Sequence, residues 1–172
     1  MNAVVVYSSK TGFTKKYADW IAAQLNIVSY DISEVNKRFL KKYDTIIFGG
    51  GVYAGKISDA KFLNKNISKL AQQHWLVFAV GLTPADDLAN IEKLKAENFE
   101  SEDLKRIDFF YFQGGIDTNK LSRTQKLGVL ALRKMVGFKK EPSVEEKWIN
   151  ESLDNDADYS DKASIQALID KV

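Results

Sequence analysis

The chain contains no cysteine and a single histidine among its 172 residues. The absence of cysteine excludes a disulfide framework, thiolate catalysis, a Cys-x-x-Cys redox pair, and iron–sulfur or zinc sites held by thiolates. One histidine leaves little room for a metal site built on imidazoles, or for a catalytic triad that needs a further imidazole. We therefore expect no metal ion, and any redox chemistry must come from a bound cofactor.

Long apolar runs are also missing, because no stretch approaches the roughly 18 apolar residues of a membrane span. The apolar residues 3–7 are few, and neither a basic leader nor a small-residue cleavage site accompanies them. The fractions of hydrophobic (45%), aromatic (12%) and charged (28%) residues are ordinary for a globular protein. These features predict a cytoplasmic protein with one domain over residues 1–172.

The net charge of +2 conceals an uneven distribution of charged residues. Residues 1–140 contain 22 basic and 14 acidic side chains, whereas residues 141–172 contain three basic and nine acidic side chains. The densest basic stretch is 120–140, which has no acidic residue. Its basic residues are Lys120, Arg123, Lys126, Arg133, Lys134, Lys139 and Lys140.

Short β-branched and aromatic runs alternate with stretches of helical periodicity along the chain. The runs predicted as strands are residues 3–7, 27–32, 44–48, 75–80 and 107–112. Helices are predicted at residues 14–25, from Ser33 to about residue 42, from Ser58 or Asp59 onward, and at residues 86–98, 121–136 and 161–172. This alternation predicts an α/β three-layer sandwich with a five-stranded parallel sheet. We expect a core of residues 1–138 and an acidic C-terminal extension, residues 139–172, that ends in the short helix.

Small residues follow the predicted strands, and ligands of such sheets bind outside the carboxyl ends of the strands. After the first strand, residues 8–14 contain four hydroxyls, one glycine and one lysine. Free backbone amides and the dipole at a helix start favour an anion there. The alternative is an ordinary capped helix behind a polar loop. We favour a phosphate site formed by Ser9, Lys10, Thr11, Gly12, Phe13 and Thr14.

The loop matches neither a P-loop nor the G-x-G-x-x-G dinucleotide motif. Residues 9–14, Ser-Lys-Thr-Gly-Phe-Thr, instead resemble the S/T-x-T-G-x-T motif of the flavodoxin family. The resemblance covers about residues 3–115. It implies a flavodoxin-like sheet of order 2-1-3-4-5 and non-covalent FMN, whose phosphate is wrapped by hydroxyls and backbone amides. Lys10 is expected to point to solvent or to assist weakly.

Two further loops are expected to hold the flavin ring. Residues 49–56 resemble the flavodoxin loop beside the isoalloxazine, where Tyr53 could stack on the ring. A carbonyl at Gly50 or Gly51 could then bond the N5 hydrogen of the semiquinone after a peptide flip. The candidates in this loop are Gly50, Gly51, Val52, Tyr53, Ala54 and Gly55. By the same resemblance, backbone groups of Gly81, Leu82 and Thr83 bind the pyrimidine edge.

The stretch 112–115 (Phe-Gln-Gly-Gly), the basic helix and the acidic tail resemble the flavodoxin-domain group that contains menaquinone-dependent protoporphyrinogen oxidases. This resemblance implies an FMN oxidoreductase that passes electrons from a porphyrinogen to a quinone, with the chemistry on the flavin and no catalytic side chain. Two alternatives remain: a diffusible electron carrier without a substrate of its own, and a binding module that has lost the flavin.

The basic stretch 120–140 also has two interpretations. It can be the last helix of the sandwich with a solvated basic face, or a surface for a membrane or an acidic partner. In the second case Arg123, Lys126, Arg133 and Lys134 would contact anionic lipid at the inner face of the membrane or a carboxylate-bearing substrate. We expect no nucleic-acid partner, and the sequence does not fix the oligomeric state.

Overall fold

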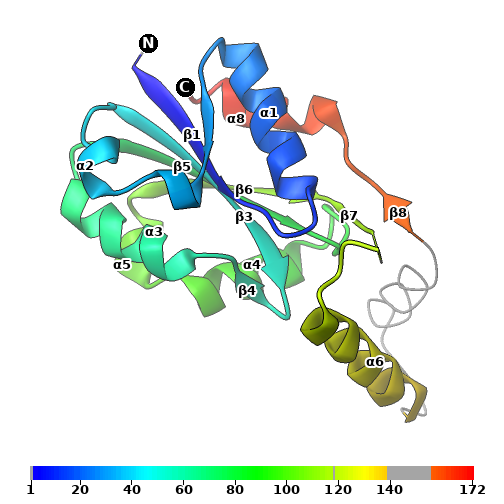
Figure 1. Cartoon of the computed structure of the whole chain (residues 1–172). Helices are drawn as coiled ribbons and strands as arrows, with labels where there is room; N and C mark the ends of the chain where they lie inside the picture. The colour runs from blue at the N-terminus through cyan, green and yellow to red at the C-terminus, as the bar shows by residue number, and fades with distance from the viewer. Residues whose placement is uncertain (1, 118, 139–155) are drawn as a thin grey trace.

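The computed structural model of the chain describes residues 2–117, 119–138 and 156–172 (Figure 1). Five parallel strands form its central sheet in the order β2-β1-β3-β5-β6. These strands are β1 (Ala3–Ser8), β2 (Ser29–Asp31), β3 (Thr45–Tyr53), β5 (His74–Gly81) and β6 (Ile107–Gln113). A short strand, β4 (Lys56–Ile57), folds back antiparallel on the end of β3. With this hairpin strand set aside, the order is the predicted 2-1-3-4-5, so the fold class is confirmed.

Apolar side chains on the two faces of the sheet form two cores. On β1, Val4 and Val6 belong to one core, whereas Val5 and Tyr7 belong to the other. This alternation follows from the period of two in a strand. The strands β1, β3 and β5 are buried on both faces, as their largely apolar sequences predict, and three glycines interrupt the apolar run of β3.

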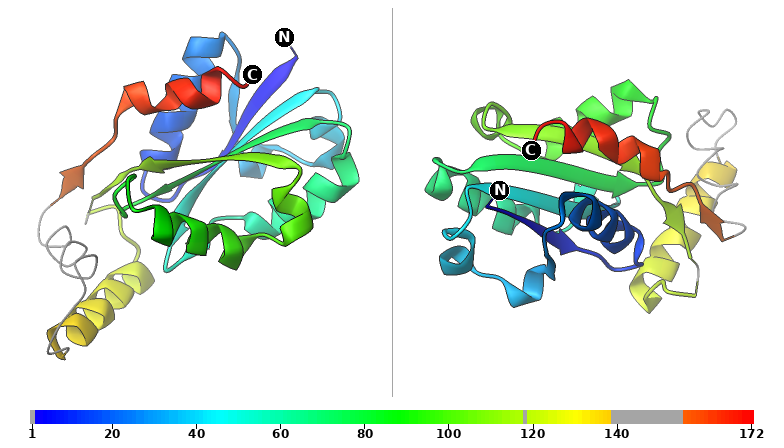
Figure 2. Two further views of the ribbon diagram at one scale, coloured as in Figure 1. Left: turned by 180° about the vertical axis from the view of Figure 1, so that it is seen from behind. Right: turned by 90° about the horizontal axis from the view of Figure 1, so that it is seen from above.

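Helices cover both faces of the sheet (Figures 1 and 2). One layer contains α1 (Phe13–Leu25), η3 (Lys162–Ile165) and α8 (Gln166–Ile169). The other contains α2 (Lys37–Leu40), α3 (Ala60–Ile67), η2 (Ser68–Leu70), α4 (Leu88–Asn98) and α5 (Ser101–Leu104). In Figure 2 the sheet is seen between the two layers, which is the predicted three-layer arrangement.

The single helix expected from Ser33 to about residue 42 is wrong. The chain instead forms η1 (Ile32–Glu34), an extended residue at Val35, and the short α2. Asp31 caps η1 in a capping box with Glu34, and the side chain of Asn36 accepts a hydrogen bond from the amide of Phe39 to start α2. Two strong N-caps so close together therefore divide the segment.

The third strand does not end at residue 48 as predicted, because β3 continues through all three glycines. Gly49 pairs with Tyr7 on one side and with Phe78 on the other. A Cβ on Gly49 would overlap the ring of Phe78. At these glycines, side chains of neighbouring elements therefore pack directly against the backbone of β3. The turn consists only of residues 54 and 55.

The C-terminal segment supplies core residues, although we expected it to extend beyond a core of residues 1–138. Ile165 and Leu168 are 1% and 0% exposed and pack with α1 in the same core as Val5. The hydroxyl of Tyr17 donates to the carbonyl of Gln113 at 2.7 Å and accepts from the amide of Asp161 at 2.9 Å. The chain ends in helical segments, as predicted, but these segments supply side chains to the core.

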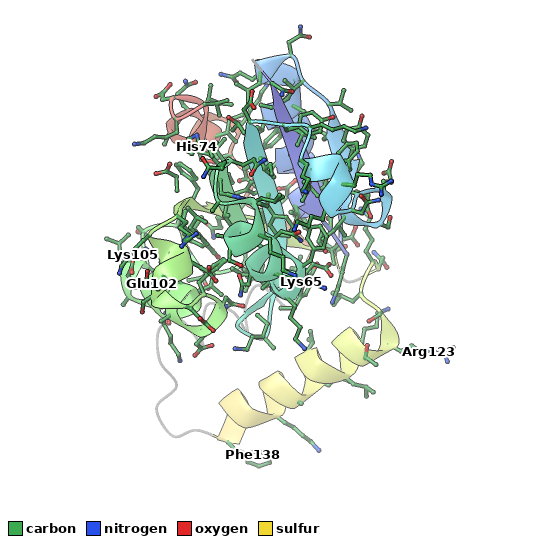
Figure 3. All side chains as sticks on the ribbon, turned by 90° about the vertical axis from the view of Figure 1, so that its left-hand side faces the viewer. Lys65, His74, Glu102, Lys105, Arg123 and Phe138 are labelled. Atoms are coloured by element: carbon green, nitrogen blue, oxygen red, sulfur yellow. The ribbon has the colours of Figure 1, made fainter. Side chains whose placement is uncertain are left out.

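The helix α6 (Arg123–Phe138) does not cover the sheet, so its interpretation as the last sandwich helix is wrong. Figures 1 and 3 show it projecting from the domain, with Arg123 at its start and Phe138 at its end. The exposed fractions of Leu127, Leu130 and Phe138 are 65%, 57% and 83%. The helical segments beside α1 are η3 and α8, whose apolar side chains belong to the core on that face of the sheet.

A small antiparallel ribbon connects this helix to the domain. It consists of β7 (Gly115–Ile116), which follows β6, and β8 (Ala157–Asp158), which precedes η3. The acidic stretch of the expected extension, residues 141–155, and the basic residues Lys139 and Lys140 lie outside the described residues. Within the described ranges, no helix has the length and apolar character that crossing a membrane requires.

If the C-terminal segment is part of the core, Ile165→Ala should lower the free energy of unfolding by about 3 kcal/mol, because it leaves a cavity under α1. Leu130→Ala is the matched control and should change it by less than about 0.5 kcal/mol, since Leu130 is exposed. Chemical denaturation of both variants measures the difference. Equal effects would contradict this account of the core.

Candidate functional site

The loop between β1 and α1 forms an open cradle at the start of a helix. Gly12 is the residue before α1 and has a φ of 99°, a conformation that favours glycine. Its amide donates to the hydroxyl of Ser9 at 3.1 Å, which closes the loop into a tight turn. The first amides of α1 have no partners within the helix, and their dipoles point at the cradle. These features favour an anion at the predicted loop.

The side chains of Thr11, Thr14 and Lys10 in this loop have three different surroundings. Thr11 lies 3.4 Å from the phenolic oxygen of Tyr53, measured from Oγ1. Thr14 is 2% exposed, so its side chain faces the interior near Gly51. Lys10 is exposed, as expected, and its ammonium lies 4.8 Å from the centroid of the Tyr53 ring. The structure thus brings Tyr53 to the predicted phosphate loop.

The second candidate segment is a hairpin instead of a glycine loop. Tyr53 pairs with Lys56, so Ala54 and Gly55 form a two-residue turn. Their φ values are 49° and 73°, and positive φ at both central residues is characteristic of a type I′ turn. Gly50 and Gly51 lie inside the sheet, so their peptides cannot flip without breaking strand pairing. The flip at Gly50 or Gly51 stays a prediction, and the Ala54–Gly55 turn is the part of this segment that is free of the sheet.

The third candidate segment follows β5 and is tied to β6. The carbonyl of Gly81 accepts from the amide of Gly114 at 2.8 Å. The hydroxyl of Tyr111 donates to the carbonyl of Thr83 at 3.0 Å, and the side-chain amide of Gln113 donates to the carbonyl of Leu82 at 3.4 Å. The carbonyls of Leu82 and Thr83 thus already have partners within the protein.

A lysine distant in sequence also reaches the phosphate loop. The ammonium of Lys120 lies 4.0 Å from the position that a Cβ on Gly12 would take. Lys120 forms an ion pair with Asp117 at 3.0 Å, and its hydrogen bond keeps the pKa of that carboxyl below its ordinary value. In the sequence Lys120 belongs only to the basic stretch, so no local signal predicts its position beside the loop at residues 9–14.

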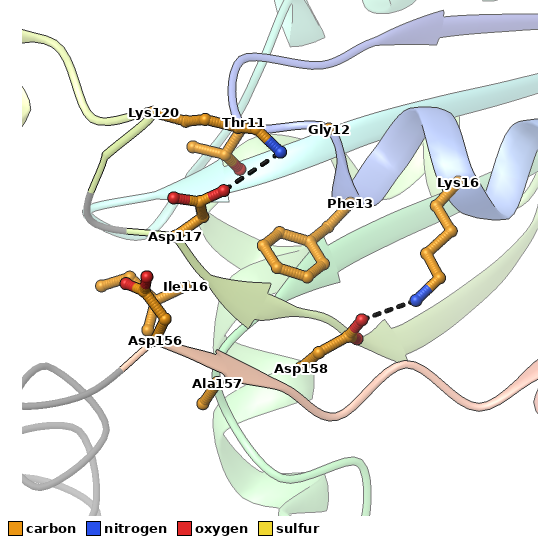
Figure 4. Close-up of a pocket in the computed structure, with 10 residues that line it drawn as sticks. All are labelled: Thr11, Gly12, Phe13, Lys16, Ile116, Asp117, Lys120, Asp156, Ala157 and Asp158. Atoms are coloured by element: carbon orange, nitrogen blue, oxygen red, sulfur yellow. Dashed lines mark hydrogen bonds and ion pairs between the residues drawn. The ribbon is translucent and has the colours of Figure 1, made fainter.

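A cavity of about 360 Å³ lies beside the start of α1 (Figure 4). Thr11, Gly12 and Lys120 line it from the loop side, and the β7–β8 ribbon lines it from the other side. Lys16 closes the far end through an ion pair with Asp158 at 2.6 Å. Burial raises the pKa of Asp158, but the hydrogen bonds from Lys16 and Ser160 outweigh it and lower the pKa overall. The cavity thus carries charges of both signs, with a lysine on the side of the phosphate loop.

An open parallel sheet with a loop of free helix amides after its first strand, at the carboxyl edge, is typical of α/β domains that bind a nucleotide phosphate. The sequence model of the flavodoxin domain family matches residues 4–143. The chain therefore belongs to the flavodoxin domain family, and this membership implies flavin binding. The hydroxyls, glycine and free amides at residues 9–14 fit the phosphate of such a cofactor.

Known proteins similar to this chain include an uncharacterized protein of Methanocaldococcus jannaschii, which is 35% identical over 106 residues, 58% of this chain and 70% of that protein. Among solved structures, two-electron reduced Megasphaera elsdenii flavodoxin has 15% identity and a TM-score of 0.47, with 87% of this chain and 96% of that chain covered. A WrbA-like flavodoxin from Agrobacterium tumefaciens has 22% identity and a TM-score of 0.46, with 74% and 92% covered.

Proposed function

We propose that the chain binds FMN and acts as an oxidoreductase on a carboxylate-bearing substrate, with protoporphyrinogen as the substrate and a quinone as the acceptor. The observation that carries the cofactor part is the cradle at Gly12, which combines open space, free helix amides and the ammonium of Lys120. FMN supplies the transfer of electrons when bound. The side chains and backbone of the chain bind and orient the cofactor.

Each predicted segment has a distinct part in this proposal. Residues 9–14 bind the phosphate, and Lys120 adds a positive charge that Asp117 holds in place before the ligand arrives. The Ala54–Gly55 turn and the amides after Gly81 border the flavin ring. Tyr53 precedes the Ala54–Gly55 turn and lies beside Thr11 of the phosphate loop. From this position it can contact the cofactor.

The proposal of a carboxylate-bearing substrate rests on the position of the basic side chains next to the cofactor site. The helix α6 begins three residues after Lys120, so a basic surface continues directly from the cofactor site. Arg123, Lys126 and Lys134 are exposed on it, and they can attract the carboxylates of a porphyrinogen. In each oxidation step, a pair of hydrogens leaves the porphyrinogen and a quinone is reduced to the quinol.

We also propose that α6 contacts an anionic membrane surface, where the quinone is found. Its exposed side chains include the apolar Leu127, Leu130 and Phe138 together with the basic residues of the same helix. A helix of this composition binds at the interface of a bilayer through apolar burial and attraction to anionic lipid. The side chain of Arg133, which we expected to take part, lies outside the described residues.

Titration of the purified protein with FMN should show a perturbed flavin absorption band that saturates at one FMN per chain. Lys120→Gln should weaken FMN binding by about threefold to tenfold, because the side chain is exposed and part of its charge effect is screened. Riboflavin, which lacks the phosphate, should bind the variant and the wild type equally.

The control is Lys105→Gln, because Lys105 is about as exposed as Lys120 and pairs with Glu102 three residues before it, far from the site (Figure 3). A wild type that leaves the flavin spectrum unchanged would contradict the cofactor proposal. Equal losses for FMN and riboflavin in Lys120→Gln would contradict only the assignment of Lys120 to the phosphate.

The FMN-loaded protein should oxidise protoporphyrinogen when a soluble quinone is present, and porphyrin fluorescence measures this directly. The protein without FMN is the control for spontaneous oxidation. A diffusible carrier would behave differently: a flavodoxin reductase would reduce it, but it would leave the porphyrinogen unchanged. That result would favour the carrier over the enzyme.

Sedimentation with lipid vesicles tests the membrane surface. The protein should bind vesicles that contain anionic lipid, and a Leu127→Ser, Leu130→Ser double variant should bind about tenfold more weakly, because two exposed apolar side chains are lost. Leu88→Ser is the control, since Leu88 is 69% exposed at the start of α4. Indifference to anionic lipid would contradict the proposal.

A further inference from the structure

The Ala54–Gly55 turn is held from one side by the end of α4. The side-chain amide of Asn98 donates to the carbonyl of Gly55 at 2.9 Å, and its oxygen accepts from the backbone amide of Ile57 at 2.9 Å. These two backbone groups face outward from the edge strand β4, since Lys56 pairs with β3. One side chain therefore takes the place of a further strand at this edge.

Asn98 is itself fixed in orientation. It is 9% exposed, and its nitrogen also donates to the carbonyl of Leu94 at 2.8 Å. Its backbone carbonyl accepts from the side chain of Asn64 at 2.9 Å. Both amide hydrogens and the amide oxygen of the side chain are thus in use, which leaves one orientation that satisfies every group.

The turn needs support of this kind because of its conformation. Ala54 carries a Cβ and yet has a φ of 49°, a region that residues other than glycine, asparagine and aspartate rarely adopt. The neighbouring ammonium of Lys56 donates to the carbonyl of Glu97 at 3.0 Å, so the end of α4 holds the turn at a second point. In the described part of the chain, the peptide between Ala54 and Gly55 makes no hydrogen bond, whereas the following peptide is held by Asn98.

We propose that Asn98 is a positioning residue for the flavin: it fixes the hairpin so that the Ala54–Gly55 peptide is the backbone group presented to the ring. This inference rests on the proposed FMN site. Asn98 does not touch the cofactor, and it acts through the turn. Asn98 fixes the peptide between Gly55 and Lys56, so any peptide flip in the turn is confined to the peptide between Ala54 and Gly55. Asn98 thereby sets whether the carbonyl or the amide of that peptide faces the ring in each oxidation state.

The test compares Asn98→Ala and Asn98→Asp with Asn66→Ala. Asn66 is a matched control, because it is 4% exposed and its side-chain amide donates within α3, to the carbonyl of Phe62 at 2.8 Å. Amide exchange of Ile57 in the protein without FMN should become at least about tenfold faster in Asn98→Ala and stay unchanged in Asn66→Ala. Asn98→Asp keeps the acceptor for Ile57 but loses the donor to Gly55, so its Ile57 exchange should stay close to that of the wild type.

The FMN dissociation constant should rise by about tenfold in both Asn98 variants relative to Asn66→Ala, and the reduction potential of bound FMN should shift in both. Faster exchange at Ile57 with an unchanged FMN affinity and potential would show a purely structural residue and overturn the proposal. A shift in Asn98→Ala that is absent in Asn98→Asp would overturn the role of the bond to Gly55. A wild type that does not bind FMN would overturn the proposed function itself, and this proposal with it.

Discussion

Close packing over the glycines of β3 is the constraint on which the rest of the site depends. The strand pairs on both sides, and the ring of Phe78 lies where any side chain of Gly49 would be. Over Gly51, a Cβ would lie 2.9 Å from the ring of Tyr53 and 3.1 Å from the hydroxyl of Thr14. Side chains of the hairpin, the phosphate loop and the neighbouring strand β5 thus pack against the glycine backbone of β3. Their relative positions are set by the absence of side chains at the centre of the sheet.

The sheet and the phosphate loop could be predicted from the sequence because their causes are local. A strand buried on both faces needs a continuous run of β-branched or aromatic residues, as in residues 3–7 and 75–80. The start of α1 needs a residue that tolerates positive φ, and Gly12 stands between hydroxyl residues there. The order of strands came from the resemblance to a family, since periodicity alone does not determine it.

The remaining features depend on contacts between distant parts of the chain. Glycine has little preference for a strand, so the run at residues 49–51 by itself predicts a loop. Its place in the strand depends on the side chains that pack against its backbone, such as Phe78. The apolar face of α6 looked like a core-facing helix, because amphipathic spacing does not tell which surface receives it. Lys120 and Asn98 meet their partners across more than forty residues, at Gly12 and at Gly55, so no motif reveals them.

The β7–β8 ribbon gives the domain a modular construction. The chain leaves the domain after Ile116 and returns at Ala157, and these two residues are paired in the ribbon. Because the ribbon closes this excursion at its base, a longer or shorter excursion changes the entropy of closure only slightly. The part of the molecule that carries α6 can therefore diverge in length and sequence while the sheet and the phosphate loop stay the same. The excursion is thus open to change during evolution apart from its base, where the ammonium of Lys120 lies beside Gly12.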